Sequence, residues 1–180
     1  ARTNPDESKR IYHWQAAASG LAAVWSRENT REALWDSMAR KEVYATTGTR
    51  IRVRVFAGWD FRQDDLVRSN FAEHGYAAGV PMGGDLTAAP KNATPKFLVR
   101  AIRDPDGANL DRIQIIKGWM DTDGKTHEKV YDVVWSGDRK PGDNGKLPPV
   151  GNTVDVKNAT WTNTIGAPEL ITVWKDPEFD

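Results

Sequence analysis

A chain of 180 residues is long enough for one domain with a well-buried core, or for a domain with a smaller unit attached. Its 25 Lys and Arg residues balance its 25 Asp and Glu residues, so the basic excess that is usual in nucleic-acid binders is missing. The sequence has no cysteine, which excludes disulfides, thiolate metal ligands and cysteine nucleophiles, and no apolar stretch approaches the ~20 residues of a membrane span. Such a composition is compatible with either the cytoplasm or the periplasm.

Residues 1–48 predict helices and short strands. A helix is expected from Pro5 to Ala18, and the apolar run 21–25 predicts a buried strand. Asn29 stands three residues before Glu32, a spacing that predicts a capping box at the start of a second helix. The β-branched and aromatic run 43–47 predicts another strand. Strand, helix and strand in this order predict a βαβ unit, which normally belongs to a larger parallel sheet or barrel.

Residues 49–180 show a different pattern, an alternation with a period of two. In the run Arg50-Ile-Arg-Val-Arg54 the aliphatic side chains are expected to face a core and the arginines to face water. Further strands are expected at residues 97–102, 112–119, 129–135 and 169–174. Two stretches rich in Gly, Pro, Asp and Asn, 57–96 and 136–151, match neither pattern and predict long loops. The predicted fold class is therefore α+β, mostly β: an antiparallel β-sandwich preceded by a short βαβ remnant of a barrel.

Several motifs occur in an order that is typical of one family. They include Gly20-Leu-Ala-Ala-Val-Trp25, Tyr44-Ala-Thr-Thr-Gly48, Gly79-Val-Pro-Met-Gly-Gly-Asp85 and Asn163-Thr-Ile-Gly-Ala-Pro-Glu-Leu170. With these motifs the chain resembles the C-terminal part of the bacterial domain-of-unknown-function 3604 family, and the resemblance covers nearly the whole chain from Gly20.

The resemblance implies that the chain is a C-terminal fragment of a longer protein whose sandwich gains another strand beyond Asp180. The upstream half of family members is similar to the polymerase-and-histidinol-phosphatase (PHP) hydrolases and would carry their His-x-His and Asp-x-His metal motifs. No such motif occurs in this chain. The implied chemistry is attack of a metal-activated water on a phosphate or sulfate ester. The divalent metal would belong to the full-length parent, and we expect no cofactor or metal site in this chain and no activity from it alone.

Four residues are candidates for the rim of the implied barrel: Glu28, Asn29, Thr47 and Arg50. Active sites of βα barrels lie at the C-terminal ends of the strands. Glu28 and Asn29 follow the first predicted strand, while Thr47 ends the second. The alternative is that Asn29 only caps a helix and Glu28 is solvated.

Other candidate ligands have simple structural explanations. His13, His74 and His127 are far apart in sequence, so they are expected to be surface or structural residues. The stretches 104–107 and 121–124 resemble parts of calcium loops but lack the later ligands, and they predict tight turns.

A second functional hypothesis is a non-catalytic sandwich that binds a partner protein or a glycan. Sugars stack on exposed indoles, which makes four tryptophans candidates, although core packing is the favoured explanation of each: Trp59, Trp119, Trp135 and Trp161. The partner expected for residues 1–48 is the missing upstream barrel or a second copy of the chain. It would cover an apolar surface that consists of Leu21, Val24, Trp25, Leu34 and Trp35.

Overall fold

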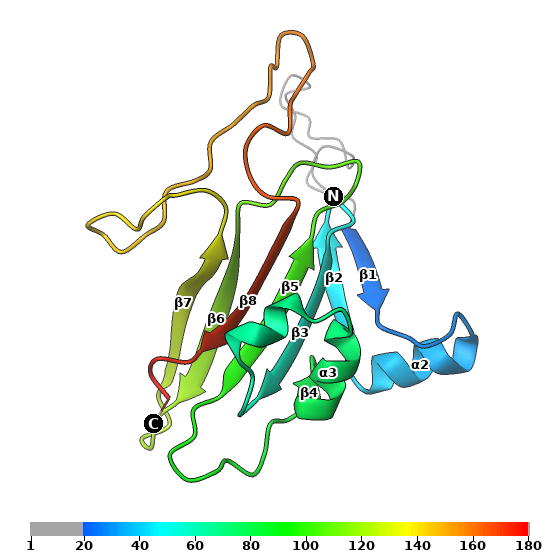
Figure 1. Ribbon diagram of the computed structural model, residues 1–180, viewed down its shortest axis with the longest axis vertical. Coiled ribbons are helices and arrows are strands. Elements are labelled where there is room, and N and C mark those ends of the chain that lie inside the picture. Colours follow the sequence, from blue (N-terminus) through cyan, green and yellow to red (C-terminus); the bar gives the residue numbers. More distant parts are fainter. Residues whose placement is uncertain (1–19, 180) are drawn as a thin grey trace, which may run out of the picture.

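The computed structural model describes residues 20–179 (Figure 1). It begins with β1 (Gly20–Val24), α2 (Arg31–Ala39) and β2 (Val43–Thr47). Next come β3 (Arg52–Gly58), the 3-10 helix η2 (Gln63–Val67), α3 (Phe71–Ala78) and the short β4 (Val80–Pro81). The chain continues with β5 (Lys96–Ile102), β6 (Arg112–Met120), β7 (Thr126–Trp135) and β8 (Glu169–Lys175). The helix expected from Pro5 to Ala18 lies outside the described residues.

A four-stranded antiparallel sheet forms the centre of the molecule, in the order β4-β3-β5-β8. Its register places Val53, Ala101 and Leu170 side by side on one face. The row Phe56, Leu98 and Val173 lies on the opposite face, because successive side chains of a strand alternate. Both faces are therefore apolar and both need a cover.

Each face of this sheet has its own cover. Phe61, next to η2, and Phe71 of α3 pack against the Phe56 face. The β6–β7 hairpin packs against the other face through Ile113 and Val134. The order helices, sheet, hairpin can be followed in Figure 1. The fold class α+β, mostly β, with antiparallel sheets is confirmed, and the described residues contain no closed barrel.

Two helical segments lie where the sequence predicted only loop. Residues 57–96 contain η2 and α3 as well as β4, so the prediction of a continuous loop was wrong. Neither segment has a long apolar repeat. α3 is held by burying Phe71 against the sheet, and η2 packs there through Leu66 beside the preceding Phe61. Residues 136–151 contain no helix or strand, as expected. In the described part of the chain, no helix combines the length and the apolar character required to cross a membrane.

β1, α2 and β2, here called the N-terminal unit, occur in the predicted order but not in the predicted orientation. β1 pairs with β2 antiparallel, with Gly20 opposite Thr47 and Val24 opposite Val43. The parallel arrangement expected from a βαβ unit was therefore wrong. A connection of this length could cross over a sheet, but Val24 and Val43, which flank it, are register partners. α2 thus lies in the connection of a long β-hairpin, between the C-terminal end of β1 and the N-terminal end of β2.

The start of α2 also differs from the prediction. Thr30 is the N-cap, and its hydroxyl oxygen accepts a hydrogen bond from the Ala33 N–H at 3.3 Å. The capping box predicted for Asn29 and Glu32 was wrong by one residue. Because Thr is also a good N-cap, the two neighbouring polar residues could not be separated by sequence pattern alone.

Candidate functional site

The helix-covered face of the central sheet carries a group of arginines. β3 places Arg52 and Arg54 on this face, and β5 places Arg100 directly opposite Arg54. Like charges in directly opposite positions on a sheet are destabilising. This row of cations therefore has to be balanced by neighbouring groups or by a bound anion.

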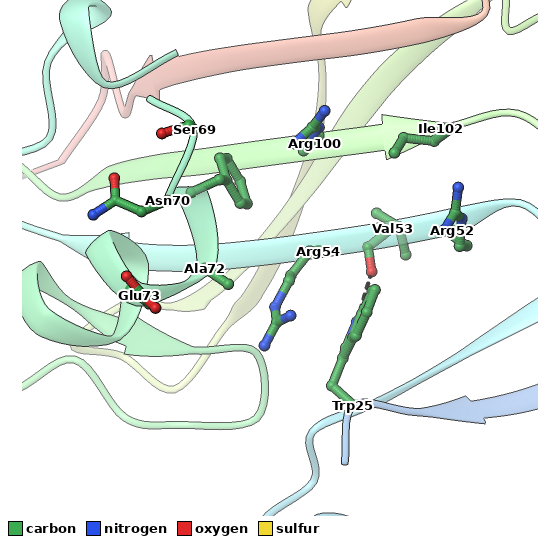
Figure 2. A pocket seen from close by; sticks show the side chains of 11 residues that line it. Trp25, Arg52, Val53, Arg54, Ser69, Asn70, Ala72, Glu73, Arg100 and Ile102 are labelled. Atoms are coloured by element: carbon green, nitrogen blue, oxygen red, sulfur yellow. Dashed lines mark hydrogen bonds between the residues drawn. The ribbon is translucent and has the colours of Figure 1, made fainter. Parts of the chain in front are cut away.

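The three arginines line a cavity of about 360 Å³, here called the arginine cavity. Its wall is completed by Trp25, Val53, Ile102 and the segment Ser69–Glu73 at the start of α3. Figure 2 shows these side chains, with the guanidinium group of Arg54 beside the ring of Trp25. The cavity therefore lies where the N-terminal unit, the sheet and α3 meet.

Acidic groups balance only part of this positive charge. Arg100 pairs with Glu169 through its Nε atom. Arg54 Nη2 is 3.8 Å from Glu42 Oε1, and it donates a hydrogen bond to the Tyr76 hydroxyl at 2.8 Å. Glu73 lines the cavity and is exposed. The cavity keeps a cationic character because three arginines line it.

Arg54 is fixed in position by aromatic rings. Its guanidinium carbon lies 4.3 Å from the centroid of the Trp25 ring, a cation–π contact. Trp25 is held in turn by a hydrogen bond from its indole N–H to the Val53 carbonyl at 3.0 Å, the dashed line in Figure 2. The Arg54 side chain is only 18% exposed, and its Nε has no hydrogen-bond partner among the described residues.

A second hollow, here called the carboxylate cleft, shares Trp25 and Arg54 with the arginine cavity. Its volume is about 660 Å³. Glu42, only 2% exposed, accepts a hydrogen bond from the Tyr76 hydroxyl and lies 3.5 Å from Arg40 Nη2. Burial raises the pKa of the Tyr76 hydroxyl, and the hydrogen bond to Glu42 raises this pKa further. Tyr76 is therefore held as a protonated donor.

Comparison with known families gives a match over residues 1–180 to the family described as "Protein of unknown function (DUF3604)". The chain belongs to the DUF3604 family. No curated protein and no solved structure matches it significantly. The family resemblance indicated by the sequence motifs is thus confirmed over the whole chain.

The structure of this DUF3604 chain does not bring the four predicted rim residues together. Glu28 and Asn29 lie exposed in the loop between β1 and α2, close in sequence to Trp25. Thr47 lies at the opposite end of the β1–β2 pair, across from Gly20. The antiparallel pairing separates them, because it places the C-terminal ends of β1 and β2 at opposite ends of the ribbon.

Arg50 has a structural partner. Its backbone N–H donates to Asp104 Oδ2 at 2.7 Å, and its guanidinium group donates to Asp106 Oδ2 at 2.8 Å. The backbone hydrogen bonds from Arg50 and Asp106 hold the pKa of the Asp104 carboxyl below its ordinary value. Arg50 thus ties the start of β3 to the turn at residues 104–107.

Sequence reasoning missed the residues that line the two hollows. The alternation around Arg54 was noticed, but all its arginines were expected to face water, and this was wrong for Arg54. Its face of the sheet is covered by α3, a helix that the sequence did not predict. Arg100, Glu42 and Tyr76 carried no motif. Only the cross-strand register and the approach of α3 bring them near one another.

His74, His127 and the acidic turns of the DUF3604 chain have structural roles, while His13 lies outside the described residues. His74 Nε2 lies 2.8 Å from Asp65, and His127 Nε2 lies 2.9 Å from Asp121. The predicted tight turns are confirmed by backbone hydrogen bonds from Gly107 to Asp104 and from Gly124 to Asp121. Within residues 20–179, no group of three His, Asp or Glu side chains is placed to hold a metal ion.

One of the four candidate tryptophans lines a third hollow. Trp161, 46% exposed, lies on a pocket of about 400 Å³ between the loop 106–109 and the segment 150–165. Trp59 and Trp135 donate their indole N–H groups to backbone carbonyls, and Trp119 stacks on His127. Trp161 is therefore the best placed of the four to meet a ligand.

Proposed function

We propose that this chain works as the substrate-binding C-terminal part of a metal-dependent hydrolase that cleaves phosphate or sulfate esters. The observation that carries the proposal is the arginine cavity, which Arg52, Arg54 and Arg100 line together. Membership of the DUF3604 family is consistent with it, and the resemblance noted in the sequence implies that longer family members have an upstream half similar to the PHP hydrolases.

The chemistry of arginine suits this role. A guanidinium group is always charged and presents planar N–H donors that match the oxygens of phosphate and sulfate groups. A cavity lined by three such groups would hold the anionic part of the ester and stabilise charge that develops on it.

The metal would come from outside the described residues. These residues offer no group of ligands for a metal ion, so no step of the proposal passes through a metal that they bind. In the parent protein, the upstream half would supply the ligands for the metal that activates water. Glu28 and Asn29 follow Trp25 closely enough in sequence to remain candidates for the rim, whereas Thr47 and Arg50 lie away from Trp25.

A hydrolysis assay on the longer gene product tests the proposal. We expect an upstream His-x-His motif in the same reading frame, and hydrolysis of 4-nitrophenyl phosphate or sulfate by the parent that EDTA abolishes. Arg52→Gln in the parent should lower kcat/KM by roughly 10-fold or more, because it removes a hydrogen bond between charged groups. Arg31→Gln, at an exposed position of α2, is the matched control. A folded, metal-loaded parent that hydrolyses neither ester would refute the proposal.

A second candidate function, glycan binding, is favoured by Trp161. Its exposed indole shares a pocket with the polar residues Asn152, Thr153 and Thr162. The indole can stack on a sugar ring, and the polar side chains can form hydrogen bonds with the sugar hydroxyl groups. A glycan array probed with the 180-residue chain tests this candidate. Binding that Trp161→Ala abolishes supports it, and absence of any signal from the folded chain contradicts it.

A further inference from the structure

The arginine cavity is apolar as well as cationic. Beside its three arginines it is lined by the side chains of Phe71 and Ile102 and by the ring of Trp25. Trp25 offers only its ring, because its indole N–H already donates to the Val53 carbonyl. A ligand that fits this lining needs both an anionic group and an apolar body.

We propose that the arginine cavity binds organic anions with an apolar body, so that the substrates are phosphate or sulfate esters of aromatic or aliphatic alcohols and not of sugars. The proposal rests on the function proposed above and names its substrate class.

The charges around the cavity explain the anionic group. Arg54 and Arg100 face each other across β3 and β5, and Arg52 lies on the same face two residues from Arg54. Glu169 pairs with Arg100 alone, and Glu42 is 3.8 Å from Arg54, beyond hydrogen-bond distance. A bound anion would reduce the repulsion within the row, while the exposed carboxylate of Glu73 on the wall disfavours a ligand with many negative charges.

The apolar wall explains the organic body. A sugar has several hydroxyl groups, each of which loses hydrogen bonds to water when it enters a cavity. Besides the arginines and Glu73, the side chains that could replace those bonds are Ser69 and Asn70. An aromatic or aliphatic group loses no hydrogen bonds and gains contact with Phe71, Ile102 and Trp25. The volume of about 360 Å³ suits one small ligand.

Binding to the ¹⁵N-labelled 180-residue chain tests the proposal without metal and without turnover. The probes are phenyl phosphate, phenyl sulfate, glucose 6-phosphate and inorganic phosphate, and the signal is the indole N–H resonance of Trp25. We expect a phenyl ester to shift this resonance and to bind at least roughly 10-fold more tightly than glucose 6-phosphate or inorganic phosphate. Such tighter binding of either phenyl ester supports the proposal, and comparison of the two phenyl esters shows whether phosphate or sulfate is preferred.

Three variants separate the contribution of the arginines, which bind the anionic group, from that of the apolar wall, which contacts the organic body. Arg52→Gln, at an exposed position, should weaken phenyl ester binding by roughly 10-fold, because one charge-assisted contact is lost. Ile102→Thr should weaken binding of phenyl esters while leaving that of inorganic phosphate unchanged. Arg31→Gln, away from the cavity, should change the binding of neither the phenyl esters nor inorganic phosphate.

Two results would overturn the proposal. One is equal or tighter binding of glucose 6-phosphate or inorganic phosphate. The other is no shift of the Trp25 resonance with any probe, in a chain whose spectrum shows it to be folded. Either result leaves the hydrolysis assay of the parent unaffected, since binding is measured without metal. A parent that fails to hydrolyse esters likewise leaves the binding result standing.

Discussion

Arg54 joins the N-terminal unit, the central sheet and α3 through one side chain. It extends from β3, stacks on Trp25, donates to Tyr76 of α3 and faces Glu42, which lies just before β2. Glu42 is almost completely buried, so the desolvation of its carboxylate has to be offset by Arg40, Arg54 and Tyr76. We expect these contacts to hold the N-terminal unit against the rest of the molecule.

Replacing Tyr76 with Phe tests this group at the level of one hydroxyl. The ring can stay packed edge-on against Phe56, while the donor to Glu42 and the acceptor for Arg54 are lost. We expect Tyr76→Phe to lower the free energy of unfolding by about 1–3 kcal/mol, because a buried carboxylate loses a hydrogen bond. Urea unfolding measures the change. Tyr44→Phe is the matched control, and equal losses for both variants would contradict the prediction.

Asp65 should make part of the stability depend on pH. Burial alone would raise the pKa of its carboxyl, but hydrogen bonds from the Arg62 N–H, Arg68 and His74 lower it overall. A folded-state pKa below the unfolded one means that the ionised group stabilises the fold above the ordinary value of about 4. That contribution is lost as the pH falls from about 4 through the lower folded-state pKa.

The Asp65→Asn variant measures this contribution. We expect it to be less stable than the wild type at pH 6, and the difference to shrink at pH 3, when unfolding by urea is followed at both values. Stability curves that run parallel from pH 6 to pH 3 would show that Asp65 does not carry the effect.

At the scale of elements, α3 can approach the central sheet closely because it has Gly75 at the contact. A Cβ added at Gly75 would lie 2.4 Å from Cδ2 of Phe56, which is fully buried. We expect Gly75→Ala to lower the free energy of unfolding by about 1–3 kcal/mol through this overlap, although alanine favours helices by about 1 kcal/mol over glycine.

Thermal unfolding of Gly75→Ala and of a control variant separates the overlap with Phe56 from the general effect of replacing glycine with alanine. At Gly118 of β6 the nearest atom to an added Cβ is the His127 carbonyl oxygen at 3.8 Å, so Gly118→Ala should leave the Tm nearly unchanged. A Gly75→Ala chain as stable as the wild type would mean that α3 can move away from Phe56 without cost.

At the scale of the whole molecule, the N-terminal unit leaves apolar surface uncovered. Trp35 of α2 is 67% exposed, and Met38 and Leu21 are also exposed. Val24 and Trp25, by contrast, are half-buried in the described chain. We propose that the exposed residues contact the upstream barrel proposed for a longer parent protein or, without that barrel, a second copy of the chain.

Light scattering at increasing concentration tests this association. We expect the chain to self-associate and Trp35→Glu to suppress it, because a charge would be desolvated in the contact. Val67→Glu, at a still more exposed apolar residue outside the N-terminal unit, should not suppress it. A monomer at every concentration would contradict self-association.

The local patterns of the sequence were sufficient for most strands. β3, β5, β6, β7 and β8 were all predicted, because alternation and β-branched residues are properties of neighbouring residues. α3 was not, since its residues Phe71 and Gly75 acquire their role only from Phe56, which comes earlier in the chain. The arginine cavity was missed for the same reason, as Arg54 and Arg100 meet through strand register.

The sequence by itself determined the fold class, the strand positions and the family, since these depend on composition, on short-range periodicity and on motifs in order. Tertiary structure alone decided that β1 and β2 run antiparallel, that α3 covers one face of the sheet, and that three arginines line one cavity. Those features depend on contacts between residues far apart in the chain, and a local sequence pattern does not specify such contacts.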